Sequence, residues 1–509
     1  MLVVTAVDAA VDDLAVVAAL VDVLGEMLAE KNAGLAGLAE RNGQLPGQVE
    51  ALSGQVEVLL ARVAKLERQV SRNSGNSGMS PSSDDIPGRT PPASKPGRGG
   101  KKKQGKQPGA PGAHLAWSDD PGDTLPLFPH GECGCGRDLD DALDLGIARS
   151  HQIAGTPEVT ATVTQYDEHA VQCRCGKTHV AEPPAGAGES GTVTCGLNLQ
   201  ALVVFLLVMH HVPVERCAQI VEALTGARPS DGFVHSMIAR AAVAVRGVNM
   251  LIRALIITAS VISADETPIR VGPGPKTKKK YLLVACTNLL TCFFLGGRSM
   301  ETFDCFVFPD LSGAVIVHDR YQNYDKIPGV LHQLCTQHLL RDLEDAVQAY
   351  PGAIWPGQAA EALRALIHAS NVARDKGLAS VPDDETAADL RLFRHAVLAG
   401  LSGIPRVPGA NTKQKPGRTL LECLKNREHD VLRFLTGTRI PPTSNQAERD
   451  LRPAKTQQKI SGRLRSEART RNRDAIRGYL DTARKHGTGL MTAIRGALAG
   501  NPWMPPLPA

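Results

Sequence analysis

Three acidic residues stand where they can act together on a phosphate. Asp265 follows an apolar run in SVISADETPIRV, Asp319 ends the run GAVIVHD, and Glu448 lies in the basic segment SNQAERDLRPAKTQQKISGR. Carboxylates from two strand ends and one helix can hold a pair of divalent metal ions. Two metal ions suit in-line phosphoryl transfer on a nucleic acid, because one activates the nucleophile and the other stabilises the leaving oxygen. These three residues are therefore candidate catalytic and metal-binding residues.

The segment that carries Glu448 is expected to form a helix. Two prolines at 441–442 interrupt the chain, and the polar residues 443–445 can cap the helix that follows. Glu448, Arg452 and Lys455 then fall on one face. In one interpretation Glu448 binds metal while the two cations contact the DNA backbone. In the other, the face is exposed and holds only an ordinary salt bridge.

Short apolar runs between 258 and 350 alternate in a definite order. Three strands with tight connections are followed by a short helix near 299–309, the strand GAVIVHD, a short helix near 322–328, the strand LHQLCTQ and the helix HLLRDLEDAVQAY. This β-β-β-α-β-α-β-α order is that of the RNase-H-like fold. It places Asp265 on the first strand and Asp319 at the end of the fourth.

Helical patterns flank this candidate catalytic core. Residues 351–440 look like a mostly helical insertion, and 441–509 contain the helix of Glu448 and the C-terminal helices. Residues 191–257 are also helical, and the stretch VERCAQIVEALTGARPSDGFVHSMIARAA resembles a DNA-binding helix–turn–helix. A plain helical hairpin explains that stretch equally well.

Residues 114–190 contain two closely spaced cysteine pairs, Cys133 with Cys135 and Cys173 with Cys175. The chain has 11 cysteines, an odd number that fits reduced thiols better than a disulfide framework. Two such pairs predict a small module with a tetrahedral zinc site. The alternative is four unbound thiols.

The N-terminal region, 1–70, carries a heptad pattern. Leucines occupy one register, at Leu24, Leu38, Leu45, Leu52, Leu59 and Leu66. Valines, leucines and one asparagine (Asn42) occupy the matching register, which favours a parallel two-stranded coil and hence a homodimer or higher oligomer. Pro46 should interrupt the helix, so the coil is expected to be strongest over 47–70. The alternative is one amphipathic helix packed on its own protein.

Basic residues are concentrated in two segments, although the net charge of the 509-residue chain is only +5. The first segment lies in 71–113, a stretch rich in Ser, Gly and Pro that is predicted to be a disordered linker. The second is 449–474. Such clusters indicate a polyanionic partner such as DNA, or else a solvated surface. The candidate DNA-binding residues are Lys101, Lys102, Lys103, Arg452, Lys455, Lys459 and Arg463.

No secretory signal precedes the first domain, and the apolar run at 201–209 is too short to span a bilayer. The sequence therefore predicts a cytoplasmic, nucleoid-associated protein without a membrane partner. Its predicted fold class is multidomain α+β. It combines an N-terminal coiled coil, a small Cys-rich zinc-binding module and an RNase-H-like α/β catalytic domain with a mostly helical insertion.

Several motifs occur together in an order that resembles the insertion sequence 66 family of transposases. They are the SPSSD of the linker, ADETPIRV, HDRYQNYD, CTQHLLRDL, SNQAERDLRPAKTQQKISG and LDTARKHG. The resemblance implies a DDE transposase in which Asp265, Asp319 and Glu448 bind Mg²⁺ (or Mn²⁺). It also implies a basic residue seven positions after the Glu, which is Lys455.

The function expected from this resemblance is binding of element ends, metal-dependent strand cleavage and strand transfer into target DNA. Small accessory transposition proteins are possible further partners. Two alternatives stay open at this stage. One is a nuclease of the same fold without strand transfer, and the other is a catalytically silent, regulatory DNA-binding protein derived from a transposase.

Overall fold

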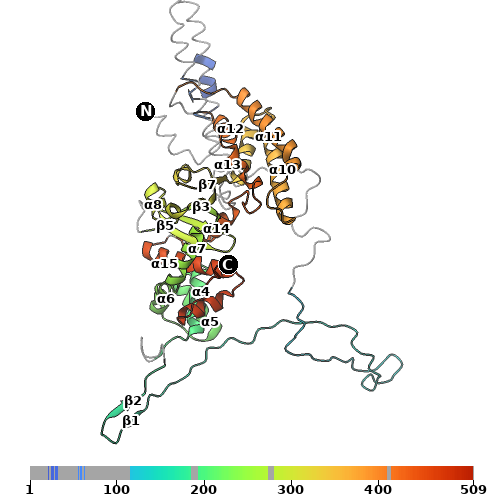
Figure 1. Cartoon of the computed structure of the whole chain (residues 1–509). Helices are drawn as coiled ribbons and strands as arrows, with labels where there is room; N and C mark the ends of the chain where they lie inside the picture. Colours follow the sequence, from blue (N-terminus) through green and yellow to red (C-terminus); the bar gives the residue numbers. More distant parts are fainter. Residues whose placement is uncertain are drawn as a thin grey trace, which may run out of the picture. The chain divides into compact units, whose positions relative to one another are not determined.

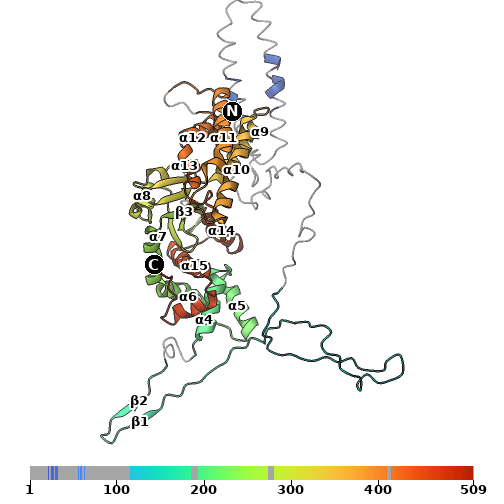
Figure 2. The same cartoon turned by 45° about the vertical axis from the view of Figure 1, so that its right-hand side comes forward.

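The structure is a computed structural model, shown in Figures 1 and 2. It describes residues 115–184, 193–272, 280–409, 414–462 and 464–507, with scattered positions between 21 and 63. One unit lies within 94–163, and a second comprises 164–509 with the N-terminal 93 residues. The described positions between 21 and 63 are helical. The rest of the predicted coil, and the linker 71–113, lie outside the described residues.

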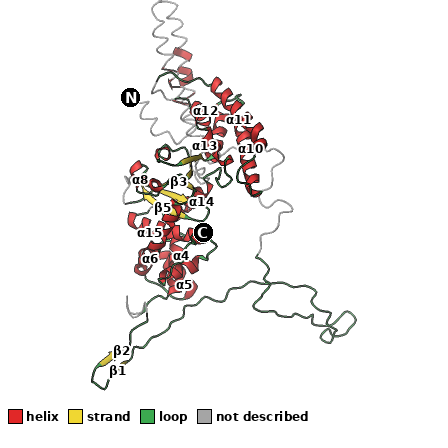
Figure 3. Ribbon diagram, in the orientation of Figure 1, coloured by secondary structure: helices red, strands yellow, loops and turns green. Residues whose placement is uncertain are grey.

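The larger unit contains a short hairpin and a five-stranded sheet (Figure 3). The hairpin strands are β1 (Ala170–Gln172) and β2 (Thr178–Val180). The sheet strands are β3 (Val261–Ile269), β4 (Lys280–Cys286), β5 (Thr291–Gly296), β6 (Val315–His318) and β7 (Leu331–Leu334). The sheet order is β5-β4-β3-β6-β7, in which β3 pairs antiparallel with β4 and parallel with β6.

Helices precede, connect and follow these strands. Before the sheet come α4 (Leu197–Val208), α5 (Val214–Thr225), α6 (Asp231–Ala244) and α7 (Arg246–Ile257). Within or directly after it come α8 (Met300–Asp304), η2 (Phe308–Asp310), η3 (Tyr324–Lys326) and α9 (Thr336–Ala349). Then follow α10 (Trp355–Asp375), α11 (Asp383–Gly403), α12 (Pro416–Asn426), α13 (Glu428–Leu432), η4 (Arg433–Leu435), α14 (Asn445–Ile460), α15 (Glu467–Lys485) and α16 (Leu490–Leu498).

The order of strands and helices predicted between 258 and 350 is the observed order, with two local differences. The predicted helix near 322–328 is only the single turn η3. Strand β7 ends at Leu334, earlier than predicted, because Cys335 already stands at the N-cap of α9. The predicted helical character of 351–440 is likewise observed in α10 to α13.

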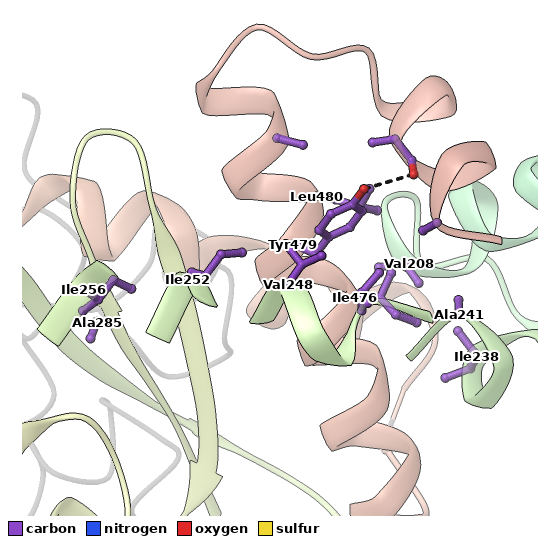
Figure 4. Close-up of a cluster of buried hydrophobic side chains, with 14 of the residues drawn as sticks. Val208, Ile238, Ala241, Val248, Ile252, Ile256, Ala285, Ile476, Tyr479 and Leu480 are labelled. Carbon is purple, nitrogen blue, oxygen red and sulfur yellow. Dashed lines mark hydrogen bonds between the residues drawn. The ribbon is translucent and has the colours of Figure 1, made fainter. Parts of the chain in front are cut away.

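Helices cover the sheet on both faces, and successive residues of its strands point to opposite sides. On β4, Leu283 and Ala285 belong to one core, whereas Leu282 and Val284 belong to another. The first core joins one face of the sheet to α4–α7, α15 and α16. Figure 4 shows part of it, where the Tyr479 hydroxyl donates to the backbone oxygen of Ala493 at 3.1 Å.

Different helices cover the opposite face. Ala447 and Leu451 of α14 pack on Val284 and Ile269. At the β6–β7 end, Val315, Val317 and Leu334 pack against α9 and the insertion helices α10–α12. Helix α14 therefore lies directly on the strand that carries Asp265.

The predicted helix–turn–helix segment forms α5 and α6. Helix α5 ends at Gly226, whose φ of 72° requires the left-handed conformation that glycine adopts readily. The Ser230 hydroxyl accepts the Phe233 N–H at 3.2 Å and caps α6. Among the described residues, no helix is long and apolar enough to cross a membrane.

Candidate catalytic site

Two of the predicted carboxylates lie on adjacent parallel strands, Asp265 in the middle of β3 rather than at its end as predicted, and Asp319 directly after β6. Strands β3 and β6 pair Ser263 with Val317, so Asp265 and Asp319, each two residues further on, are next to each other. An Asp265 carboxylate oxygen accepts the Glu266 N–H at 2.8 Å, and an Asp319 oxygen accepts the Tyr321 N–H at 2.8 Å. The backbone thereby orients both carboxylates.

The third carboxylate, Glu448, approaches from the first turn of α14. Helix α14 begins after Ser444, as the prolines at 441–442 predicted, although the Ser444 side chain makes no capping hydrogen bond. The Glu448 Oε1 atom is buried without a hydrogen-bond partner among the described residues. It lies 3.8 Å from Nε2 of His338, in the first turn of α9.

Asp265 and Asp319 affect each other's region electrostatically, and His338 interacts with Asp265, Asp319 and Glu448. Burial raises the pKa of Asp265 to about 8, and the charges of Glu266 and Asp319 add to this effect. Burial opposes protonation of His338, but Cys335, Glu448 and Asp319 outweigh it and raise the pKa of His338 to about 9. His338 therefore lies between Glu448 on one side and the Asp265–Asp319 pair on the other.

This donor set fits a hard divalent cation. It consists of carboxylate oxygens, which Mg²⁺ and Mn²⁺ prefer. Asp265 and Asp319 repel each other when both are ionised, as the raised pKa of Asp265 records. The Glu448 Oε1 atom, which faces His338, accepts no hydrogen bond from a described residue. A bound cation would relieve the repulsion and use that acceptor.

Glu266, although adjacent to Asp265 in sequence, points to the other face of the sheet, as strand alternation predicts. Its carboxylate accepts the Tyr324 hydroxyl at 2.7 Å and the Arg298 Nε–H at 2.8 Å. The Arg298 guanidinium also stacks 3.8 Å from the centre of the Tyr321 ring. These contacts hold the loop after Asp319, and they join residues too distant in sequence for a local pattern to reveal.

A buried ion pair anchors the helix of Glu448 to α15. Lys485 Nζ lies 2.7 Å from an Asp450 carboxylate oxygen, and the two side chains are 9% and 2% exposed. The Thr291 hydroxyl donates to the same oxygen at 2.9 Å. Gln446 donates to the other oxygen at 2.8 Å. Both oxygens of the Asp450 carboxylate therefore accept hydrogen bonds, and its contacts tie α14 to α15 and β5.

The predicted DNA-binding side chains of α14 are accessible. Arg452, Lys455 and Lys459 are exposed, and none of the three forms an ion pair with a described carboxylate. The salt bridge between Glu448 and Arg452, considered as the alternative from sequence, is absent among these described residues. Arg463 and Lys101–Lys103 lie outside the described residues.

The two cysteine pairs occupy matching turns, which lie in different units of the structure. The Cys133 N–H donates to the Arg137 oxygen, and the Cys173 N–H donates to the Lys177 oxygen, each at 2.8 Å. Hydrogen bonding from Cys135 lowers the pKa of Cys133, and hydrogen bonding from Cys175 lowers that of Cys173. Each turn therefore favours a thiolate, but the zinc site itself stays a prediction.

Another group of possible metal ligands includes His318, the residue before Asp319. It consists of His318, Asp325 and His332. The two imidazoles are hydrogen-bonded to each other at 3.1 Å, and Asp325 forms an ion pair with Arg427 at 2.9 Å. The imidazoles bind each other and Asp325 binds the cation Arg427. We therefore interpret this group as structural support for the loop that follows Asp319.

Family comparison agrees with this geometry. The family model described as "Transposase IS66 family" matches residues 192–472, more than half of the 509-residue chain. The chain belongs to the IS66 transposase family. The IS66 match covers α4 to α14 and thus every described residue of the candidate site. A family of unknown function (DUF6444) matches residues 24–116, and no curated protein matches the chain.

The raised pKa of Asp265 predicts a stability change in the metal-free protein. With a folded pKa of about 8, above the ordinary value, the native state binds this proton more tightly than the unfolded state. The free energy of unfolding therefore falls as pH rises from about 4 to about 8. We expect Asp265→Asn to remove this dependence and to stabilise the protein by a few kcal/mol, roughly, at pH 8. Urea denaturation in EDTA at pH 5 and pH 8 measures this, and equal pH dependence in both proteins would contradict it.

Proposed function

We propose that this IS66-family chain is a DDE transposase with an RNase-H-like catalytic domain. It binds the ends of its element, cleaves DNA strands and joins the freed ends to target DNA. The proposal rests on the neighbouring positions of Asp265 and Asp319. It is supported by Glu448, which approaches His338 from α14, while His338 also interacts with Asp319. The strand order, with three antiparallel strands followed by two parallel ones, supports the fold assignment.

The three carboxylates are proposed to hold Mg²⁺ (or Mn²⁺), which would activate the attacking oxygen and stabilise the leaving one. In cleavage, water forms a bond to phosphorus and the 3′-oxygen leaves. In joining, that 3′-hydroxyl attacks a target phosphate, whose own 3′-oxygen leaves. The role of the chain is to orient the carboxylates and the DNA, and the supports described for Asp265 and Asp319 serve this purpose.

Joining distinguishes a transposase from a nuclease of the same fold. Purified protein is incubated with Mg²⁺, a labelled duplex that ends like the element, and a supercoiled target plasmid. We expect labelled DNA to become covalently attached to the plasmid. Cleaved but never joined DNA would instead assign the nuclease function, and DNA binding without cleavage would assign the regulatory one.

We propose that the exposed cations of α14 bind DNA phosphates beside the carboxylates. Arg452→Ala/Lys455→Ala should weaken binding to any duplex about tenfold and reduce the slope of log K against log salt by about 2, because fewer counterions are released. Fluorescence anisotropy at several salt concentrations measures both. The control, Arg374→Ala/Lys376→Ala on α10, should change neither. An unchanged slope in the α14 variant would remove these side chains from the interface.

The cysteine turns are proposed to bind structural zinc. We expect the full-length protein, purified without chelator, to contain about one zinc ion per chain, because four thiolates make one tetrahedral site. Cys173→Ser should lower that content, whereas Cys305→Ser, a change at an exposed cysteine outside both turns, should not. Elemental analysis provides the measurement, and a fully folded protein free of zinc would contradict the proposal.

The remaining partners are proposed from the sequence pattern. The heptads of 1–70 would pair two chains, as the joining of two element ends requires, in a homodimer or higher oligomer. The α5–α6 pair is a candidate for contacting element DNA. Accessory transposition proteins and association with the nucleoid accord with a transposase, which acts where the DNA is.

A further inference from the structure

Helices α9 and α14 begin side by side although the insertion separates them in sequence. The N–H and the hydroxyl of Thr336 both donate to the Pro442 oxygen, each at 2.9 Å. The Ser444 N–H donates to the Cys335 sulfur at 3.3 Å, across 109 positions of sequence. The chain therefore leaves for the insertion after α9 and returns to the N-terminus of the same helix.

Helix α14 has no side-chain cap, and contacts with the start of α9 hold its first residues instead. The Ser444 hydroxyl makes no hydrogen bond, so it does not satisfy the free N–H groups of the helix. The Ser444 N–H is instead held by Cys335, which is 1% exposed. The Glu448 N–H donates to the Ser444 oxygen at 3.1 Å, so the position of Ser444 determines where the Glu448 backbone lies.

His338 restricts the Glu448 side chain from the same direction. Cys335, His338 and Glu448 each have one atom that could bind a metal, and these three atoms lie within 4.8 Å of one another. The His338 and Glu448 side chains are 26% and 23% exposed, so each leaves the other little free space. The His338 Nδ1 atom is buried without a hydrogen-bond partner among the described residues, and its Nε2 atom lies 3.8 Å from Glu448 Oε1.

We propose that Cys335 and His338 are positioning residues for Glu448. Cys335 fixes the start of α14, and His338 fixes the carboxylate within the site, so that Glu448 is held ready to bind metal beside Asp265 and Asp319. The inference rests on the proposed function, because it assigns Glu448 as a metal ligand. It adds two residues of α9 that contact the ligand rather than the metal.

Direct metal binding tests this role without relying on catalysis. Mn²⁺ is titrated into the full-length protein and free Mn²⁺ is measured by electron paramagnetic resonance. Removing a side chain that orients a ligand lowers metal affinity by about tenfold or more. We expect this loss for His338→Leu and a smaller one for His338→Gln, whose amide nitrogen replaces Nε2. Cys335→Ala should weaken binding more than Cys335→Ser, which keeps an acceptor for the Ser444 N–H.

Two controls separate positioning from general damage. His486→Leu alters a half-buried histidine at the end of α15, whose ring packs on Trp503, and should leave Mn²⁺ affinity unchanged. Thermal melting identifies any variant that fails to fold. If His338→Leu does not fold, the comparison of His338→Gln with His338→Asn carries the test, because Asn does not reach the Nε2 position.

The outcomes distinguish this inference from the proposed function. If Glu448→Gln weakens Mn²⁺ binding and the folded His338 and Cys335 variants do not, the positioning role is wrong and the metal site stands. If Glu448→Gln and Asp319→Asn also leave Mn²⁺ binding unchanged, the metal site itself is wrong.

Discussion

Asp265→Asn, Asp319→Asn and Glu448→Gln should each reduce DNA strand cleavage at least about a hundredfold, as expected when a group that stabilises transition-state charge is lost. The carboxamides keep the shape of the side chains but lose the negative charge that divalent cations require. All three substitutions should lower cleavage, because each removes one of the proposed metal ligands. Binding of element ends should stay within about twofold of wild type, since a carboxamide of equal size disturbs neither fold nor DNA contacts.

Matched exposed carboxylates provide the control for this result. Glu301 and Asp304 of α8 are exposed and form no ion pair with a described residue. Glu301→Gln and Asp304→Asn should cleave at the wild-type rate. Wild-type cleavage by Asp319→Asn would exclude Asp319 from the mechanism. Equal losses in the α8 variants would show that the loss in the triad variants is unspecific.

Lys485→Met should lower the free energy of unfolding by roughly 3–5 kcal/mol, the cost of leaving a buried charge unpaired. It removes the ammonium that neutralises Asp450, while Thr291 and Gln446 still donate to the carboxylate. Because Asp450 lies two residues after Glu448 on α14, cleavage should fall as well. Denaturation with urea, monitored by circular dichroism, measures the stability change.

A double variant distinguishes the unpaired charge from lost packing. Asp450→Asn/Lys485→Met removes both charges and should recover a large part of the loss, because no ion is left buried. Lys376→Met, which breaks a largely exposed pair with Glu385, should cost less than about 1 kcal/mol. Equal losses in Lys485→Met and the double variant would show that packing, not charge, explains the effect.

The strands, and the elements on which Asp265, Asp319 and Glu448 lie, could be predicted because their signals are local. The runs before Asp265 and within GAVIVHD are apolar at successive positions, as in strands covered on both faces. The Pro-Pro pair and polar residues before Glu448 likewise mark the start of a helix. Each carboxylate could therefore be assigned to a recognisable element before any contact between the elements was known.

The supports of the site had no such signal. No local pattern indicates that Cys335 and His338 contact the helix of Glu448, because nothing local shows that the insertion returns Pro442 and Ser444 to the start of α9. The same holds for Arg298, whose partners Glu266 and Tyr321 lie on separate elements. Contacts of this kind depend on the tertiary path of the chain and become visible only in three dimensions.

We propose that Asp265, Asp319 and Glu448 carry out metal-dependent cleavage at the ends of the element. The most direct measurement follows a duplex with the terminal sequence of the element that encodes this chain, incubated with purified protein and either Mg²⁺ or EDTA. We expect a nick at the element end that leaves a free 3′-hydroxyl, in Mg²⁺ only, and no nick with Glu448→Gln. Cleavage of equal extent in EDTA, or by Glu448→Gln, would contradict it.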